Sequence, residues 1–183
     1  MRSPRSIRHK GKELSEILEA HARFVRGEAG GERANLSGAD LSRADLAGAN
    51  LFLADCRGAN LKGADLREAK LASADLREAN LCRADLRKAD LTEANLSGAD
   101  LSEAKAGGTE LFRASFRQSI LRGADFGAAN FRDAELEGAD FRGASLKTAI
   151  LREAKLAGAD FSGADLSSAL LPPGFEAATP AKK

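Results

Sequence analysis

Residues 34–53 read ANLSG ADLSR ADLAG ANLFL, four five-residue units with one pattern. The same unit continues without insertion or deletion to residue 173, which makes 28 consecutive pentads. The third residue, here called the centre, is Leu in 21 pentads and Phe in 5, and the first residue is Ala in 26. The second residue is Asp in 12 and Asn in 6. So strict a repeat predicts one small structural unit stacked many times.

The spacing of the apolar residues decides the local geometry. Steps of two and three would distribute them around the whole circumference of an α-helix, at about 100° per residue. In a straight strand, each step of three would move them to the opposite face. We therefore expect three extended residues followed by a bend across the last two positions, repeated so that the chain forms a coil.

Glycine at the fifth position suggests the size of this coil. Gly occupies that position in 11 pentads, and when pentads are grouped by fours, five of these glycines follow the first side and none follows the fourth. Glycine favours bends with positive φ. The bias predicts four sides per coil and corners of more than one turn type.

The units ADLSR, ADLRE, ANLCR and ADFRG match the consensus A-(D/N)-L-x-x, and residues 34–171 resemble the pentapeptide-repeat family. The resemblance implies an all-β fold, a right-handed quadrilateral parallel β-helix (solenoid) with the centres and the preceding Ala inside. Seven coils follow from four pentads per coil. With strands about 4.8 Å apart, the rod is expected to be about 34 Å long.

The core should be a set of ladders with steps of twenty residues. Central Phe residues fall only in the last three coils, which predicts a bulkier core there. An empty space beside Ala106 would cost about 2–5 kcal/mol, so we expect Phe126 to fill it. Cys82 points outward and should not form a disulfide with Cys56. The candidate core ladder is Leu36, Cys56, Leu76, Ala106, Phe116, Phe126, Phe131, Phe141 and Phe161.

The flanking segments do not repeat. Residues 1–12 carry five basic side chains and are expected to form a disordered tail. Residues 13–33 are expected to be a capping helix and a linker, with His21 as a packed, neutral imidazole on the apolar face. That face consists of Leu14, Ile17, Leu18, His21, Phe24 and Val25.

The C-terminal end of the rod has little sequence to cover it. Pro172 and Pro173 end the repeat, and only the tail 174–183 follows. Open coils expose core side chains and unpaired backbone groups. We therefore expect a homodimer through the C-terminal coil, with Ile150, Leu170, Leu171 and Phe175 as the candidate dimer end.

Composition excludes several classes of protein. With 28 basic and 27 acidic residues there is no field for nucleic acid or a membrane surface, and 2 Cys and 2 His give neither a disulfide framework nor a zinc domain. No catalytic set, phosphate loop or metal-binding spacing is present. We predict a non-enzymatic protein without cofactor or metal. No apolar h-region follows the basic residues 1–12, and no stretch approaches the roughly 18 apolar residues of a membrane span, so we expect a cytoplasmic protein.

One outward column predicts a partner surface. Phe52, Ala72, Thr92 and Phe112 lie at successive steps of twenty on the fourth side, with Leu53 beside Phe52. We slightly favour the interpretation that the N-terminal segment folds over its first part. If the strip is instead exposed, an apolar strip among charged residues marks a binding site for a protein partner of unknown identity.

The resemblance also implies a specific partner. The best-characterised members of the family bind type II topoisomerases, chiefly DNA gyrase, as acidic, DNA-like rods, and protect them from quinolones or peptide toxins. Here the four sides carry formal charges of −1, 0, −1 and −1, so no side is an acidic stripe. We therefore favour a rigid protein-binding scaffold over the alternative, a gyrase-binding protection or immunity protein.

Overall fold

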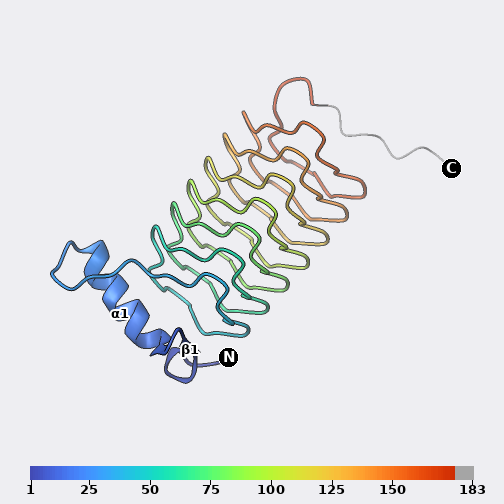
Figure 1. Cartoon of the computed structure of the whole chain (residues 1–183). Coiled ribbons are helices and arrows are strands. Elements are labelled where there is room, and N and C mark those ends of the chain that lie inside the picture. The colour runs from blue at the N-terminus through green and yellow to red at the C-terminus, as the bar shows by residue number, and fades with distance from the viewer. Residues whose placement is uncertain (176–183) are drawn as a thin grey trace.

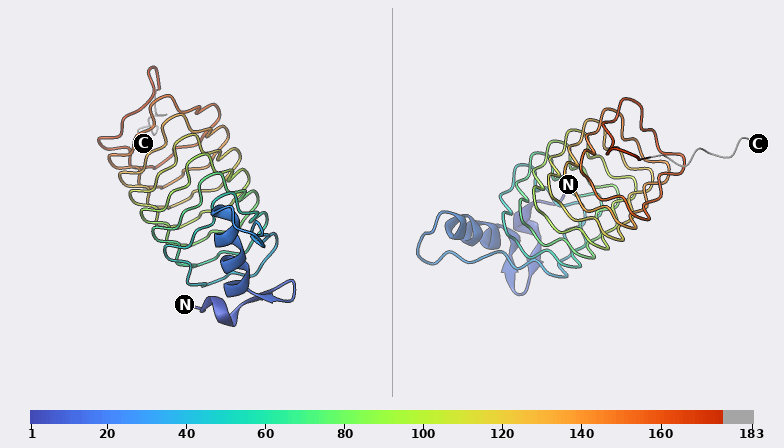
Figure 2. Two further views of the ribbon diagram at one scale, coloured as in Figure 1. Left: turned by 90° about the vertical axis from the view of Figure 1, so that its left-hand side faces the viewer. Right: turned by 90° about the horizontal axis from the view of Figure 1, so that it is seen from above.

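The computed structural model describes residues 1–175, and its main feature is a rod of stacked coils (Figure 1). Four short elements precede the rod: a 3₁₀ helix η1 (Pro4–Ser6), strands β1 (Arg8–His9) and β2 (Lys12–Glu13), and helix α1 (Leu14–Val25). Figures 1 and 2 place α1 at one end of the rod and the last described residues at the other.

The coils are joined in a parallel register of twenty residues. Every bridge between two pentads pairs residues twenty positions apart, from Asn35 with Asp55 to Ile150 with Leu170. The centre Leu36 donates its N–H to Asp55 on the next coil at 2.7 Å, and Asp55 donates back to Ala34 at 2.9 Å. Four pentads therefore complete one turn of the rod, and backbone ladders run along its length.

The corners differ from the prediction of several turn types. The fifth residue has φ between 55° and 71° at every corner from Gly38 to Ser168. The next residue closes each turn, as Ala39 does by donating to the carbonyl of Leu36 at 3.0 Å. A single kind of β-turn with positive φ at its third residue thus forms all described corners. Leu53 and Arg43 adopt this positive φ as glycine does. The hydrogen bonds to the next coil, from Leu53 to Ala72 and from Arg43 to Lys62, hold the backbone in this conformation.

Asp and Asn at the second position support these corners. All 18 of them accept, through Oδ1, the backbone N–H two residues later, at 2.9–3.4 Å. Their side chains stabilise the bend locally. The recurrence of Asp in the repeat is therefore explained by its structural role at each corner.

The core consists of the first and third residues of each pentad. The predicted ladder residues are at most 1% exposed, except Phe161, which is only half-buried because it lies in the last coil. Phe126 packs between Phe131 at 5.0 Å and Phe141 at 6.2 Å between ring centroids. Its filling of the space beside Ala106 stays a prediction. The bulk of the aromatic core thus lies in the C-terminal half.

Two polar residues replace Ala in this core without leaving a hydroxyl unpaired. Thr109 donates its Oγ1–H to the carbonyl of Ala106 at 2.7 Å, and Ser119 donates to Phe116 at 2.7 Å. Each hydroxyl therefore bonds the same carbonyl that closes the preceding corner. Buried polar groups are tolerated when they are paired in this way.

Residues 1–12 are ordered against the rod, which corrects the prediction of a disordered tail. Arg2 forms a parallel bridge with Ala44, and its N–H donates to Arg43 at 2.6 Å. Ile7 is 1% exposed. Strands β1 and β2 form a hairpin whose turn, Lys10 and Gly11, has positive φ at both residues. The free edge of the first coil and the apolar Ile7 outweigh the repulsion among the basic side chains.

Helix α1 presents the expected apolar face to the same end. Leu14 and His21 are fully buried, and Ile17 and Leu18 are partly buried against the core. Phe24, by contrast, is 36% exposed. The helix begins at Leu14, one residue later than predicted, because Glu13 pairs in β2 and donates its N–H to the Glu16 carboxylate at 2.7 Å.

Candidate protein-binding surface

The structure brings the predicted apolar column together on the fourth side. Backbone bonds link it in order: Leu53 donates to Ala72 at 3.0 Å, Ser73 to Thr92 at 2.8 Å, and Glu93 to Phe112 at 2.8 Å. Phe52 is 38% and Leu53 37% exposed, whereas Ala72, Thr92 and Phe112 are half-buried. The exposed apolar surface is therefore concentrated at the N-terminal end of the column.

Arginine side chains flank the other end of the column. The guanidinium of Arg113 lies 4.8 Å from the centroid of the Phe112 ring, and that of Arg132 lies 5.5 Å from it. Both distances allow a cation–π interaction. Phe112 is therefore partly covered within the chain, and Phe52 with Leu53 is the most exposed part of the column.

The N-terminal segment borders Phe52 without covering it. His21 accepts the N–H of Ala34 through Nδ1 at 3.1 Å and stacks on Phe24 with ring centroids 5.7 Å apart. Burial is the largest cause that lowers the pKa of His21, Arg33 acts in the same direction, and the nearby carbonyl of Phe52 opposes them. The imidazole is thus neutral and packed between α1 and the main chain of the column.

Four outward carboxylates of the second and third coils are paired with arginine. Asp55, Asp65, Asp75 and Asp85 each form a two-pronged ion pair with the arginine two residues later, at 2.6–2.9 Å. The Arg57 guanidinium lowers the pKa of Asp55 to about 2. Further along, Asp140 contacts both Arg122 and Arg142. The negative charge of each of these carboxylates is therefore neutralised by an arginine of the same chain.

The candidate dimer end spans the last coil, residues 154–173, together with Ile150 of the coil before it and Phe175 just after it. Leu170 is 42% exposed and bridges Ile150, while Leu171 is half-buried. The ring of Phe175 packs on Phe161 with centroids 5.4 Å apart. Residues 176–183 of the predicted tail lie outside the described part of the chain.

A comparison with protein-family models matches "Pentapeptide repeats (8 copies)" over residues 32–68, 69–105, 109–147 and 149–171. The chain belongs to the pentapeptide-repeat family. Proteins of this family fold as right-handed quadrilateral β-helices, and the twenty-residue register agrees with that architecture. The comparison with curated proteins finds no match.

Several solved structures are similar to this pentapeptide-repeat chain. HetL, involved in heterocyst differentiation regulation in the cyanobacterium Nostoc sp. strain PCC 7120, is 34% identical over 79% of this chain and 75% of its own, with a TM-score of 0.36. A thylakoid-lumen protein of Arabidopsis thaliana is 27% identical over 57% and 70%, with a TM-score of 0.37. QnrB1, a plasmid-mediated fluoroquinolone resistance protein, is 24% identical over 74% and 72%, with a TM-score of 0.40.

Sequence reasoning missed several surface residues. It did not single out Ile120, which is 38% exposed on the second side, or the hairpin that places His9 beside the first coil. The pair Lys10-Gly11 is a weak hairpin signal that could have been noticed, because two-residue hairpin loops favour glycine. Within residues 1–175, no helix is long and apolar enough to cross a membrane.

Proposed function

We propose that this pentapeptide-repeat protein is a non-enzymatic scaffold, and that a protein partner binds along the apolar column. Pentapeptide-repeat proteins are in general structural or binding proteins. Because ladders connect every coil to the next, the rod presents its outward side chains at fixed spacings. A segment with apolar side chains could follow the column in steps of about 4.8 Å.

The exposure of Phe52 and Leu53 carries this proposal. Both are large apolar side chains that lie next to each other and remain more than one third exposed. The partly exposed Phe24 stacks on His21, and the nearby carbonyl of Phe52 acts on the pKa of that imidazole, so Phe24 and Phe52 lie in the same part of the molecule. Adjacent exposed apolar groups of this kind are typical of interaction sites.

DNA gyrase, or another type II topoisomerase, is the alternative partner. A DNA-like rod needs carboxylates that stay unpaired, as phosphates are. In this chain Asp55 and Asp65 are bound by Arg57 and Arg67, and the pentads together carry a formal charge of only −3. These ion pairs favour the scaffold over the DNA mimic.

Affinity capture from a native lysate with matched variants tests the proposal. The double substitution Phe52→Lys with Leu53→Lys should abolish capture of the partner, whereas Ile120→Lys, equally exposed on another side, should leave it unchanged. Identical captured proteins for all three baits would contradict the column as the binding surface. Gyrase subunits in the catch, with protection of supercoiling from a quinolone, would establish the alternative.

We also propose that residues 1–33 cap the rod. Arg2 bonds the first coil between its second and third sides, and His21 bonds it at Ala34. Leu14 and Ile7 are fully buried and belong to the same core cluster as the first coil. The free thiols of Cys56 and Cys82 are typical of a reducing compartment, which supports the cytoplasm as the site of action.

The last coil, we propose, pairs with the last coil of a second copy. Within residues 1–175, the N–H groups of Leu156, Phe161 and Leu166 have no hydrogen-bond acceptor, although equivalent groups elsewhere bond the next coil. Light scattering should give twice the chain mass of 19.2 kDa. Leu171→Arg should halve it, and Ile120→Arg should not. A monomeric wild-type protein at high concentration would refute this dimer.

A further inference from the structure

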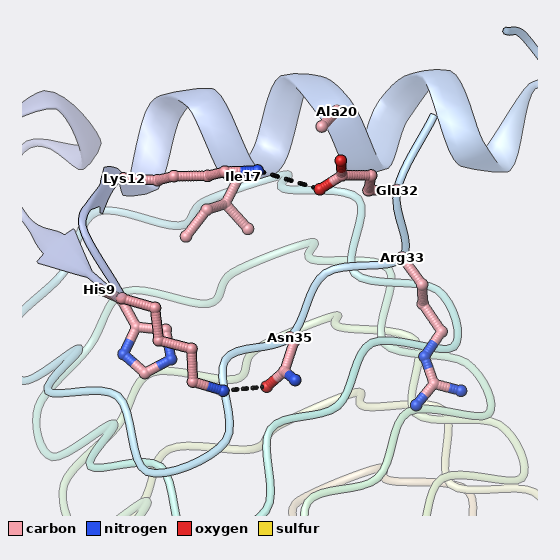
Figure 3. A pocket seen from close by; sticks show the side chains of 8 residues that line it. His9, Lys12, Ile17, Ala20, Glu32, Arg33 and Asn35 are labelled. Carbon is pink, nitrogen blue, oxygen red and sulfur yellow. Dashed lines mark hydrogen bonds and ion pairs between the residues drawn. The ribbon is translucent and has the colours of Figure 1, made fainter. Parts of the chain in front are cut away.

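A cavity of about 240 Å³ lies between the hairpin, α1 and the start of the rod (Figure 3). Ile17 extends from the helix into this space, with Ala20 beside it on α1. Figure 3 shows His9 and Asn35 on the opposite wall. The volume is below the roughly 300–1,000 Å³ of pockets for drug-sized ligands, so only a small chemical group can enter it.

The lining of the cavity is basic. Lys10, Lys12 and Arg33 contribute three positive charges, and Glu32 contributes one negative charge. Lys12 is bound to Glu32 at 3.0 Å. Arg33 has no ion pair among residues 1–175. The charge that remains on the lining is positive, and an anion would be attracted to it.

Three polar groups that line the cavity have unused hydrogen-bonding capacity; Lys10 and Asn35 are exposed, whereas the Nε2 atom of His9 is buried. Lys10 Nζ donates to Asn35 Oδ1 at 2.7 Å, which leaves further N–H groups on the ammonium. Asn35 Oδ1 also accepts the N–H of Ser37, so its amide is oriented and its Nδ2 has no acceptor among the described residues. His9 Nε2 is buried without a partner within the same residues. Buried polar atoms without partners are uncommon and call for an explanation.

We propose that this cavity binds a small carboxylate that carries a short aliphatic group. The carboxylate accepts hydrogen bonds from Lys10 Nζ and Asn35 Nδ2, and from Nε2 of His9 in the tautomer protonated there. The aliphatic group contacts Ile17 and Ala20 on α1. Such a ligand would satisfy the polar wall and bury the apolar wall at the same time.

The chemistry fits either a free organic acid or the C-terminal carboxylate of a peptide. Both present two acceptor oxygens next to an aliphatic carbon. The volume admits only the carboxylate and its short aliphatic group, so the rest of a peptide would lie outside the cavity. A cation is repelled by the lysines and Arg33. The proposal is independent of the apolar column, because no residue lining the cavity belongs to that column.

Calorimetric titration of the full-length protein with butyrate tests the proposal, with butylamine and butyramide as probes of the same shape. Butyrate should bind, and the other two should not. Lys10→Met should weaken butyrate binding about tenfold or more, because it removes a charge-assisted hydrogen bond. Lys62→Met, which removes a lysine outside the cavity, should leave the affinity unchanged.

A second variant guards against loss of the fold. Ala20→Leu fills the apolar side of the cavity and should abolish binding, while circular dichroism checks that the rod is intact. A peptide ending in valine, compared with its C-terminal amide, separates the two sources: tighter binding than butyrate indicates a chain terminus, and weaker binding indicates a free acid. Equal binding of acid and amide, no effect of Lys10→Met, or no binding of butyrate would overturn the proposal.

Discussion

The two ends of the rod are built from the same pentad but differ in burial. At the N-terminal end, the centres Leu36 and Leu41 of the first coil are fully buried beneath residues 1–33. At the C-terminal end, the equivalent centres Leu156 and Phe161 are only half-buried. The difference shows that the repeat determines the middle of the rod, whereas each end depends on residues outside the repeat.

Backbone pairing differs between the ends in the same way. Arg2 accepts the N–H of Asp45 at 2.8 Å and His21 accepts that of Ala34 at 3.1 Å, so the first edge is partly occupied. In the last coil, Leu156 and Leu166 have no such acceptor within residues 1–175. Open strand edges are sites of association. We therefore expect the covered first end to contribute to the stability of the fold and the open last end to associate with another chain.

The largest effect is expected from removing one apolar contact at the covered end. Leu14→Ala should lower the free energy of unfolding by about 2–5 kcal/mol, because Leu14 is fully buried. Leu171→Ala, at the open end, should lower the free energy of unfolding by less than half as much, because that side chain is only half-buried in the single chain. The measurement is made at a protein concentration low enough for the chain to be monomeric. Urea denaturation of both variants measures the difference. Equal losses would mean that the two ends are equally stabilised.

Two glycines allow the N-terminal cap to be compared with a corner of the rod. A Cβ added to Gly31 would lie 2.5 Å from Phe24 Cα and 2.7 Å from the carbonyl carbon of Arg23, so Gly31→Ala should cost about 1–3 kcal/mol. A Cβ added to Gly38 would have no atom within 4 Å. Gly38→Ala should therefore lower the free energy of unfolding only through the strain of an alanine at φ 67°, about 1 kcal/mol. Thermal unfolding distinguishes them. A larger loss from Gly38→Ala would show that rod corners, and not the cap, demand glycine.

The rod could be predicted from the sequence because its geometry is local and periodic. The steps of two and three, with Asp or Asn before each centre, determine which side chains face inward and how each corner is supported. The twenty-residue spacing also predicted that the residues from Phe52 to Phe112 form one column. The exposure of Phe52 was not predictable, because it depends on how α1 approaches the first coil.

What the sequence did not predict rests on single, non-repeating contacts. Ile7 stands alone in a basic segment, so only its contact with the first coil reveals that residues 1–12 are ordered. The bias of glycine among the sides was misleading for a related reason. Backbone ladders impose positive φ on Arg43 and Leu53 as firmly as on Gly38, so composition did not report the turn type.

The smallest effect is expected for charge pairing, and it again separates the ends. Asp55, near the covered end, is 5% exposed, and its pKa is lowered to about 2, first by the hydrogen bonds from Arg57. Because this pKa lies below the unfolded value of about 3.9, the carboxylate stabilises the fold above that pH. The stabilisation should amount to about 1–2 kcal/mol and disappear as the pH falls from about 4 to 2.

Asp55→Asn keeps the corner hydrogen bond but removes the charge, so its loss of stability should be present at neutral pH and vanish near pH 2. Asp160, in the last coil, is the matched control. The hydrogen bond from Ser162 is the largest cause that lowers the pKa of Asp160. Its carboxylate lies 3.6 Å from Nε of Arg142, which is farther than the Asp55 carboxylate lies from Arg57. Asp160→Asn should therefore change stability less at every pH. If both variants follow the same pH curve, the ion pair between the buried Asp55 and the half-exposed Arg57 contributes no more than a fully exposed one, and the two ends differ only in apolar packing.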